Sequence, residues 1–174
     1  KLYANDRTAA PERPDGKAVL PCTPLAIVKL LSEIGVYGDS EKPIAGKTVS
    51  IFNRSEVIGR PLAVMLSNDG ARVFSFDEFG PLEFIDAIPG EINISRSEAL
   101  AQSDIVVTGV PSSTFPKIGA AEVRDNTVCV NFSSVPNFED DINTHTDTYI
   151  PRIGPMTVAM CMRNTLRLYT NFHA

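Results

Sequence analysis

A polar loop at residues 53–59 lies between two apolar runs, which is where the phosphate-binding loop of a nucleotide site would stand. Arg54 and Ser55 offer a charge-assisted and a neutral hydrogen bond to a phosphate group. The N–H groups that begin the following helix, with the positive end of its dipole, would also attract an anion. Only Gly59 remains of the glycines of a Gly-x-Gly-x-x-Gly fingerprint, so a plain strand-to-helix turn is the alternative.

An acidic residue, Asp77, ends the next apolar run. It follows Gly59 by 18 positions, close to the ~20 expected for the carboxylate that binds the adenosine ribose in dinucleotide sites. A carboxylate accepts hydrogen bonds from both ribose hydroxyls and repels a 2′-phosphate, so Asp77 favours NAD over NADP. Two alternatives stay open: the Arg54 guanidinium could receive the 2′-phosphate of NADP, and Asp77 could be an aspartate of a solvated turn.

The residue types that bind metals are few and scattered. The three cysteines form no Cys-x-x-Cys pair, and their odd number argues against a disulfide framework. The two histidines lie far from the cysteines in the sequence, and the acidic run 139–141 has no second ligand cluster and is interpreted as a solvated turn. We therefore expect no metal site and a reducing, cytoplasmic compartment. The cysteines and histidines are Cys22, Cys129, Cys161, His145 and His173.

The composition is that of one globular domain. The chain has 174 residues, of which 43 % are hydrophobic and 21 % are charged. Its net charge of −5 at pH 7 argues against a basic surface that follows a nucleic-acid backbone. No apolar run approaches the ~18 residues that are needed to span a membrane. We expect neither a nucleic-acid nor a membrane partner.

The polar loop and Asp77 belong to a predicted strand–helix–strand unit. Two β-branched, apolar runs predict strands over 48–52 and 71–76. The run 62–66 between them predicts a short helix, closed by Asn-Asp-Gly. A strand, a turn, a helix and a second strand within about 30 residues form a βαβ unit.

The rest of the chain continues the alternation of helices and strands less regularly. Residues 79–95 contain two prolines and two glycines and are predicted to be an irregular surface insertion. Met156, Met160 and Met162 are predicted to pack into the core through the last helix. The remaining predicted elements are a helix over 25–34 with Thr23 as N-cap and Gly35 after its last turn, a helix over 96–102, strands over 105–108 and 127–130, a strand stub at 148–150 and a helix over 156–168.

Several near-continuous apolar strands predict a mainly parallel sheet with helices on both faces. The predicted fold class is α/β, Rossmann-like and doubly wound. In such sheets ligands bind beyond the carboxyl ends of the strands, at the point where the strand order reverses. The candidate site is therefore formed by the residues that follow the strands: Asn53, Arg54, Ser55, Asp77, Gly109, Val110, Pro111, Asn131, Phe132 and Ser133.

Four motifs follow one another along the chain: Pro21-Cys22-Thr23-Pro24; Gly46-Lys47-x-Val49-x-Ile51-x-x-Arg54-Ser55-x-x-x-Gly59-x-Pro61; Ser103-Asp104-Ile105-Val106-Val107-x-Gly109-x-Pro111; and Gly154-Pro155-Met156-Thr157-Val158-Ala159-Met160 with Asn164-Thr165. Together, over about residues 21–166, the chain resembles the methylenetetrahydrofolate dehydrogenase and dehydrogenase/cyclohydrolase family. Within it, the chain is similar to the monofunctional, NAD-dependent fungal-type enzymes, in which an asparagine precedes Arg-Ser, as Asn53 does here.

The resemblance implies hydride transfer from a tetrahydrofolate substrate, 5,10-methylenetetrahydrofolate, to NAD, in the one-carbon metabolism that supplies purine biosynthesis. It also implies a homodimer. No catalytic residue is assigned, because the lone pair of the folate nitrogen expels the hydride and the protein supplies orientation. The implied contacts are Arg54, Ser55, Val57 and Ile58 for the pyrophosphate and adenosine, Asp77 for the ribose, Gly109, Val110 and Pro111 for the nicotinamide half, and Pro155 and Thr157 for the nicotinamide and folate.

The expected domain arrangement has three parts. Residues 1–20 are expected to be a tail or linker remnant, residues 21–168 the NAD-binding domain and residues 169–174 a C-terminal tail, with the family's N-terminal folate-binding lobe absent. Tyr3 and Arg7 mimic the Tyr-x-x-x-Lys spacing of that lobe, but an arginine cannot give up its proton, so no cyclohydrolase activity is expected. Two alternatives remain: a non-catalytic NAD-binding module or fragment, and a bifunctional dehydrogenase/cyclohydrolase that uses NADP.

Overall fold

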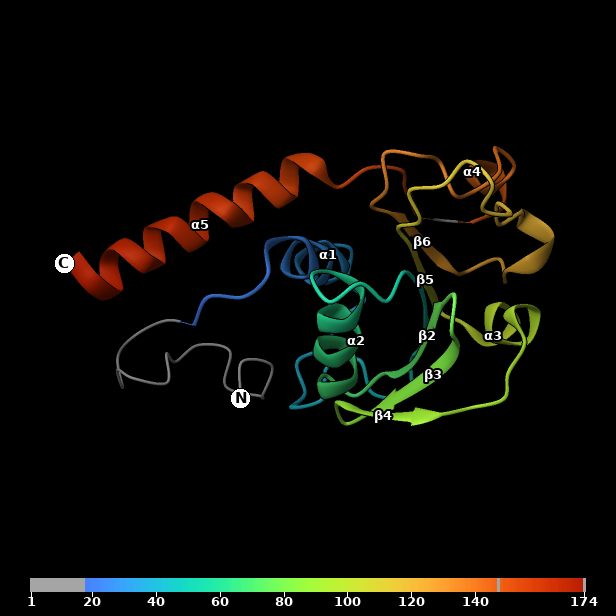
Figure 1. Ribbon diagram of the computed structural model, residues 1–174, viewed down its shortest axis with the longest axis horizontal. Coiled ribbons are helices and arrows are strands. Elements are labelled where there is room, and N and C mark those ends of the chain that lie inside the picture. The colour runs from blue at the N-terminus through green and yellow to red at the C-terminus, as the bar shows by residue number, and fades with distance from the viewer. Residues whose placement is uncertain (1–17, 147, 174) are drawn as a thin grey trace.

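Seven strands form the sheet at the centre of the molecule: β1 (Thr48–Phe52), β2 (Arg72–Asp77), β3 (Gly80–Ile85), β4 (Ile88–Glu91), β5 (Ile105–Thr108), β6 (Val128–Asn131) and β7 (Thr148–Ile150). The computed structural model describes residues 18–146 and 148–173 (Figure 1). The order of the strands in space is β4-β3-β2-β1-β5-β6-β7. The pairs from β2 to β7 are parallel, whereas β2–β3 and β3–β4 are antiparallel.

The helices are α1 (Cys22–Glu33), α2 (Gly59–Asn68), α3 (Arg96–Gln102), η1 (Ala120–Glu122), α4 (Ile142–His145) and α5 (Gly154–His173). Helix α5 packs on α1 and extends away from the sheet (Figure 1). One buried cluster joins α1 and α2 to one face of the sheet. A second cluster joins α3 and α4 to the other face. The prediction of a mainly parallel, doubly wound α/β sheet is therefore confirmed.

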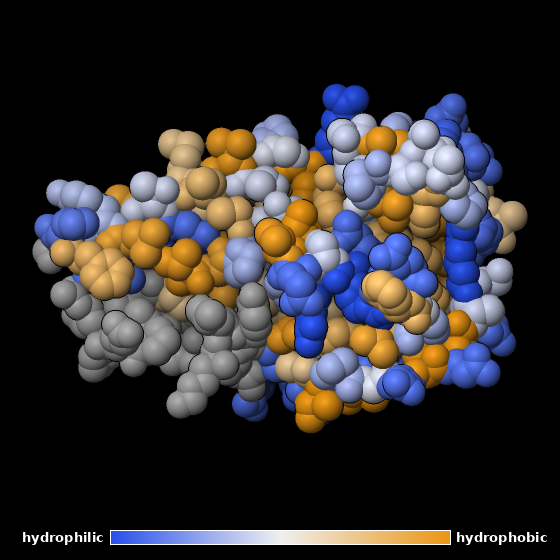
Figure 2. All heavy atoms as spheres, in the orientation of Figure 1, coloured by the Kyte–Doolittle hydropathy of each residue, from blue (hydrophilic) through white to orange (hydrophobic). Residues whose placement is uncertain are grey.

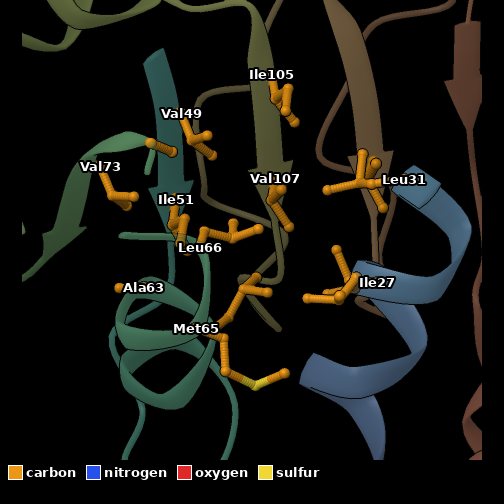
Figure 3. Packing of buried hydrophobic residues seen from close by; sticks show 14 of the residues in the cluster. Ile27, Leu31, Val49, Ile51, Ala63, Met65, Leu66, Val73, Ile105 and Val107 are labelled. Atoms are coloured by element: carbon orange, nitrogen blue, oxygen red, sulfur yellow. The ribbon is translucent and has the colours of Figure 1, made fainter. Parts of the chain in front are cut away.

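The larger core lies between the sheet and the helices α1 and α2. Figure 3 shows Ile27 and Leu31 of α1 on the side of the sheet that carries the apolar side chains of β1 and β5, and Met65 of α2 extending toward α1. All three are 0 % exposed. Burying an aliphatic side chain of this size contributes roughly 1.5–3 kcal/mol. These contacts hold α2 against β1, so the loop between them is positioned at both ends.

The prediction of an irregular insertion over residues 79–95 is wrong, because β3 and β4 form a hairpin there. The two residues between the strands, Asp86 and Ala87, have φ values of 47° and 67°, and positive φ at both positions is what a type I′ turn requires. Pro89 lies in β4, an edge strand, where a missing N–H costs little. The prolines and glycines that suggested a loop are thus compatible with two outer strands.

The N-cap of the first helix lies two residues before the predicted one. α1 starts at Cys22, with Pro21 in the N-cap position and no side-chain capping bond, so Thr23 lies inside the helix rather than before it. The Leu25 N–H donates to the Pro21 carbonyl at 3.0 Å. The predicted end is confirmed, because Gly35 follows the C-cap with a φ of 80°.

The boundaries of the predicted domain shift at both ends. The prediction for residues 1–17 lies outside the described residues, but Leu20, assigned to the tail, is 3 % exposed and belongs to the core. Its carbonyl accepts a hydrogen bond from Asn164 Nδ2 at 2.6 Å. Residues 169–173 are the last turns of α5 rather than a tail, because no glycine or proline interrupts the helix after its first turn.

Helix α5 exposes one apolar face along its length. Met162, predicted to lie in the core, is 69 % exposed, although Met160 packs against the buried cluster. Figure 2 shows apolar side chains gathered over the part of the molecule where α5 lies. Within the described ranges, no helix is both long and apolar enough to cross a bilayer. The exposed apolar side chains of α5 are Val158, Met162, Leu166, Leu168, Tyr169 and Phe172.

Candidate functional site

A cavity of about 610 Å³ lies at the carboxyl ends of β1, β2 and β5. The chain leaves β1 toward β2 on one side and later returns to β5 on the other. This is the switch point at which open α/β sheets bind ligands. Of the site residues predicted from the sequence, the cavity brings together Asn53, Arg54, Ser55, Asp77, Val110 and Pro111.

Asn53 joins the two loops that meet at the switch point. Its Nδ2 donates to the Gly109 carbonyl at 2.7 Å, and its Oδ1 accepts from the Ser55 N–H at 2.9 Å. Its own N–H donates to the Phe76 carbonyl at 3.2 Å. A Cβ on Gly59 would stand 1.5 Å from the Asn53 carbonyl oxygen. Only glycine therefore allows α2 to begin this close to the loop.

Ser55 satisfies the N–H groups at the start of α2. Its hydroxyl oxygen accepts from Ile58 N at 3.3 Å and from Gly59 N at 3.4 Å, and its carbonyl accepts from Arg60 N at 3.0 Å. Pro61 has no N–H to offer. The donors expected to be free for a phosphate are thus bonded within the loop. The hydroxyl hydrogen of Ser55 and the positive end of the helix dipole remain.

Arg54 and Asp77 form an ion pair at the rim of the cavity. Arg54 Nε donates to Asp77 Oδ2 at 2.8 Å, and Nη2 donates to Asp77 Oδ1, a bidentate arrangement. The guanidinium also donates to the carbonyls of Ser75 at 3.0 Å and Gly80 at 2.8 Å. The Phe79 N–H donates to Asp77 Oδ1 at 2.8 Å. Since the Arg54 side chain is only 10 % exposed, its guanidinium is part of the cavity wall.

The loops after β5 and β6 pack on each other beside the cavity. A Cβ on Gly109 would stand 1.9 Å from the Phe132 ring, so glycine here lets the ring lie against the backbone. Asn137, which is 1 % exposed, accepts from the Val110 N–H at 2.9 Å and donates to the Val110 carbonyl at 3.0 Å. Ser133 Oγ donates to the same carbonyl at 3.1 Å. Both polar groups of the Val110 backbone are therefore fixed.

Other proposed site residues lie outside the cavity lining. Asn131 is 2 % exposed, and its Nδ2 donates to carbonyls that include that of Pro151, which ties β6 to the segment before α5. Val57 is 73 % exposed, and Pro155 and Thr157 belong to the first turn of α5. The proposed residues that do not line the cavity are Val57, Ile58, Gly109, Asn131, Phe132, Ser133, Pro155 and Thr157.

Four phenylalanines line the cavity, and none of them was predicted from the sequence. Phe52 stacks on Phe76 with ring centroids 4.8 Å apart, and Phe115 meets Phe52 edge-on at 6.0 Å. Phe79 lines it as well and is 86 % exposed. Phe52 and Phe76 lie at the ends of strands, directly before Asn53 and Asp77. Their positions could therefore have been predicted from the sequence. Phe115 lies in a loop and has no such position in the sequence.

The described residues provide no metal centre and no activated thiol in the core. Between residues 18 and 173, apart from residue 147, no three His, Cys, Asp or Glu side chains gather as a metal would require. Burial raises the pKa of the Cys129 thiol to about 12. Cys129 is therefore a neutral core side chain at physiological pH.

The fold and the position of the cavity define a Rossmann-like α/β domain with a ligand cavity at its switch point. The model of the family described as the NAD(P)-binding domain of tetrahydrofolate dehydrogenase/cyclohydrolase matches residues 21–173. The chain therefore belongs to the tetrahydrofolate dehydrogenase/cyclohydrolase family and contains its NAD(P)-binding domain.

Similar proteins point to one branch of this family. The methylenetetrahydrofolate dehydrogenase [NAD(+)] of Dictyostelium discoideum is 41 % identical over 98 % of this chain and 56 % of its own length. The enzyme of the same name from Saccharomyces cerevisiae is 38 % identical over 89 % of this chain and 53 % of its own length. This chain thus spans about half the length of the curated relatives that it matches.

A solved structure agrees with this relationship. The NAD-dependent 5,10-methylenetetrahydrofolate dehydrogenase from Saccharomyces cerevisiae superposes with a TM-score of 0.88 at 37 % identity, over 98 % of this chain and 58 % of that chain. The bifunctional FolD of Campylobacter jejuni, at 23 % identity and a TM-score of 0.70, shares the fold over 88 % of this chain and 51 % of its own.

Proposed function

We propose that this chain is the cofactor domain of an NAD-dependent dehydrogenase that oxidises 5,10-methylenetetrahydrofolate to 5,10-methenyltetrahydrofolate. The observation that carries the proposal is the ion pair of Arg54 and Asp77 at the rim of the switch-point cavity. It occurs in a chain whose relatives at 38–41 % identity bear the name of an NAD-dependent enzyme of this reaction.

The residues around the cavity fit the adenosine and pyrophosphate of a dinucleotide. A carboxylate has about four acceptor positions, and Arg54 and Phe79 do not fill all of those on Asp77. Asp77 can therefore still accept a ribose hydroxyl. The Ser55 hydroxyl can donate to a phosphate oxygen beside the N-terminus of α2. When NAD is bound, its nicotinamide ring supplies the acceptor of the hydride.

The same ion pair favours NAD over NADP. In many NADP sites a nearby arginine receives the 2′-phosphate. Here Arg54 already donates to Asp77, Ser75 and Gly80. The Asp77 carboxylate would also repel a phosphate dianion. An incoming 2′-phosphate would have to break the ion pair before Arg54 could bind it.

The contribution of the β5 side of the cavity is orientation. Hydride transfer from the folate carbon needs little acid–base work from side chains, since the folate nitrogen drives it, and no catalytic residue is proposed. Asn137 holds the Val110 backbone, and Phe132 closes on Gly109. We place the nicotinamide half against this rigid wall, with Pro155 and Thr157 toward the folate. Holding the folate carbon and the nicotinamide carbon in contact lowers the activation barrier of the hydride transfer.

We also propose how this domain is arranged within the whole enzyme. A folate-binding lobe would pack on the exposed apolar face of α5, whose Met162 and Leu166 are 69 % and 65 % exposed. The enzyme would be a cytoplasmic homodimer serving purine biosynthesis. Light scattering on the full-length protein tests the assembly: we expect the mass of two copies, and a monomer at micromolar concentration would refute the dimer.

Calorimetric titration of the full-length protein with NAD, NADP and 5,10-methylenetetrahydrofolate tests the function, together with an assay of NADH formation. We expect NAD to bind more tightly than NADP and NADH to form with the folate. Binding of NAD without any turnover would indicate a non-catalytic module instead. If neither dinucleotide binds, the proposal fails at its first step.

A further inference from the structure

Arg96 stands at the start of α3, where its charge is unfavourable for the helix. It follows Ser95, whose hydroxyl accepts from the Glu98 N–H at 3.2 Å in a capping box, so Arg96 occupies the first helical position. The positive end of a helix dipole disfavours a cation there. Contacts outside α3 must therefore hold this side chain.

Those contacts join α3 to the loop that follows β5, to η1 and to the end of β1. Arg96 Nη2 donates to the Lys117 carbonyl at 3.1 Å and approaches a Glu122 carboxylate oxygen to 3.2 Å. The guanidinium carbon lies 5.9 Å from the centroid of Phe52 and 5.5 Å from that of Phe115, within the range of cation–π attraction. Arg96 Nε is buried and has no hydrogen-bond partner in the described part of the chain. The guanidinium is therefore held on this side by its contacts with the rings of Phe52 and Phe115.

Arg96 therefore anchors the cavity wall that Phe115 forms. The loop over residues 111–119 contains no helix or strand. Arg96 contacts it at a backbone carbonyl and at the Phe115 ring, and that ring lines the cavity with Val110 and Pro111. Without the guanidinium, the ring would lose a face-on partner and the loop would lose a tether.

We propose that Arg96 is a positioning residue for the cofactor: it holds Phe115 as a wall against which the adenine base packs. The inference rests on the proposed function, because the base is that of NAD. Arg96 touches neither the cofactor nor the reacting atoms. It acts through the Phe115 ring, which lines the cavity and offers a planar base an aromatic surface to pack against.

Titration of the full-length protein with two halves of the cofactor tests this role. ADP-ribose carries the adenine, and nicotinamide mononucleotide does not. We expect R96M and F115A to raise the Kd for ADP-ribose about tenfold, which corresponds to about 1.4 kcal/mol, and to leave the Kd for nicotinamide mononucleotide unchanged. Base–aromatic contacts have contributions of this order. R96K, which keeps the charge, should recover part of the affinity.

R124M is the matched control. Arg124 is also paired with a carboxylate, that of Asp104 at 3.2 Å, but it lies at the amino end of the strands. R124M should leave both dissociation constants unchanged. In kinetics with NAD, R96M should raise KM and spare kcat. The R96M/F115A double variant should bind ADP-ribose no more weakly than F115A alone, because both changes act on one ring.

Two outcomes overturn the inference alone. The first is wild-type ADP-ribose affinity in folded R96M and F115A. The second is an equal loss of nicotinamide mononucleotide affinity, which would mean a general distortion. If R96M does not fold, F115L decides, because loss of the ring with an apolar side chain kept must still raise the Kd for ADP-ribose. A wild-type protein that binds neither NAD nor ADP-ribose would overturn the proposed function and this inference with it.

Discussion

Charge at the adenosine end of the cavity depends on two side chains that hold each other. Arg54 and Asp77 together present little net charge, and each limits what the other can bind. Leaving a buried guanidinium without its carboxylate costs free energy. Binding another anion in place of the carboxylate would lower that cost. The 2′-phosphate of NADP is an anion of the right kind.

Replacing Asp77 by serine removes the repelling charge and frees Arg54 for that phosphate. We expect the preference of D77S for NAD over NADP, measured as the ratio of kcat/KM values, to fall about tenfold, or ~1.4 kcal/mol. D86S is the control, because Asp86 forms a similar pair with Lys42 at 2.5 Å in the hairpin turn. An unchanged ratio in D77S would remove Asp77 from the ribose site.

Replacement of Gly109 is expected to destabilise the fold beside the cavity. A Cβ there would meet the Phe132 ring at 1.9 Å, so G109A must displace the ring or the loop. We expect a loss of 1–3 kcal/mol in the free energy of unfolding, roughly the cost of overpacking, and weaker NAD binding. At Gly119 the nearest atom, Asp141 Oδ2, is 3.8 Å away, so G119A should be nearly neutral. Urea denaturation of both variants checks this, and equal stabilities would contradict it.

At the scale of elements, the β3–β4 hairpin carries a strained turn. Ala87 has a φ of 67°, a conformation that glycine adopts without the Cβ clash. We expect A87G to raise the free energy of unfolding by about 1 kcal/mol. A159G, on the exposed side of α5, should lower it by roughly 0.5–1 kcal/mol. Thermal denaturation should therefore shift in opposite directions, and a destabilised A87G would contradict the strain.

The elements that the sequence could predict are those whose signals are local. β1 and α2 follow from an apolar, β-branched run, a polar loop and Pro61. The polar residues at the ends of β1 and β2 line one cavity at the same edge of the sheet. The hairpin was missed because prolines interrupt helices and inner strands but not an edge strand such as β4. Arg96 and Phe115 were missed because their contact depends on how α3 and a distant loop pack together.

At the scale of the whole molecule, the two cores give the sheet a stable centre and less stable borders. β1 and β5 have strands on both sides and buried residues on both faces, whereas all of β4 is exposed. We expect amide hydrogen exchange to be slowest in β1 and β5 and much faster in β4, because exchange follows local opening. Mass spectrometry of peptic peptides checks this. Equal protection of residues 48–52 and 88–91 would contradict it.

The side-chain amide of Asn53 has a consequence for the energetics of binding. It bonds the loop after β1 to the loop after β5, so the two sides of the crevice are joined by the fold itself. The conformational entropy of these loops, roughly 1–2 kcal/mol per residue, is therefore lost when the chain folds and not when a ligand arrives. A ligand meets a pre-organised crevice. We expect association to proceed at the pace of diffusional encounter, without a slow closing step.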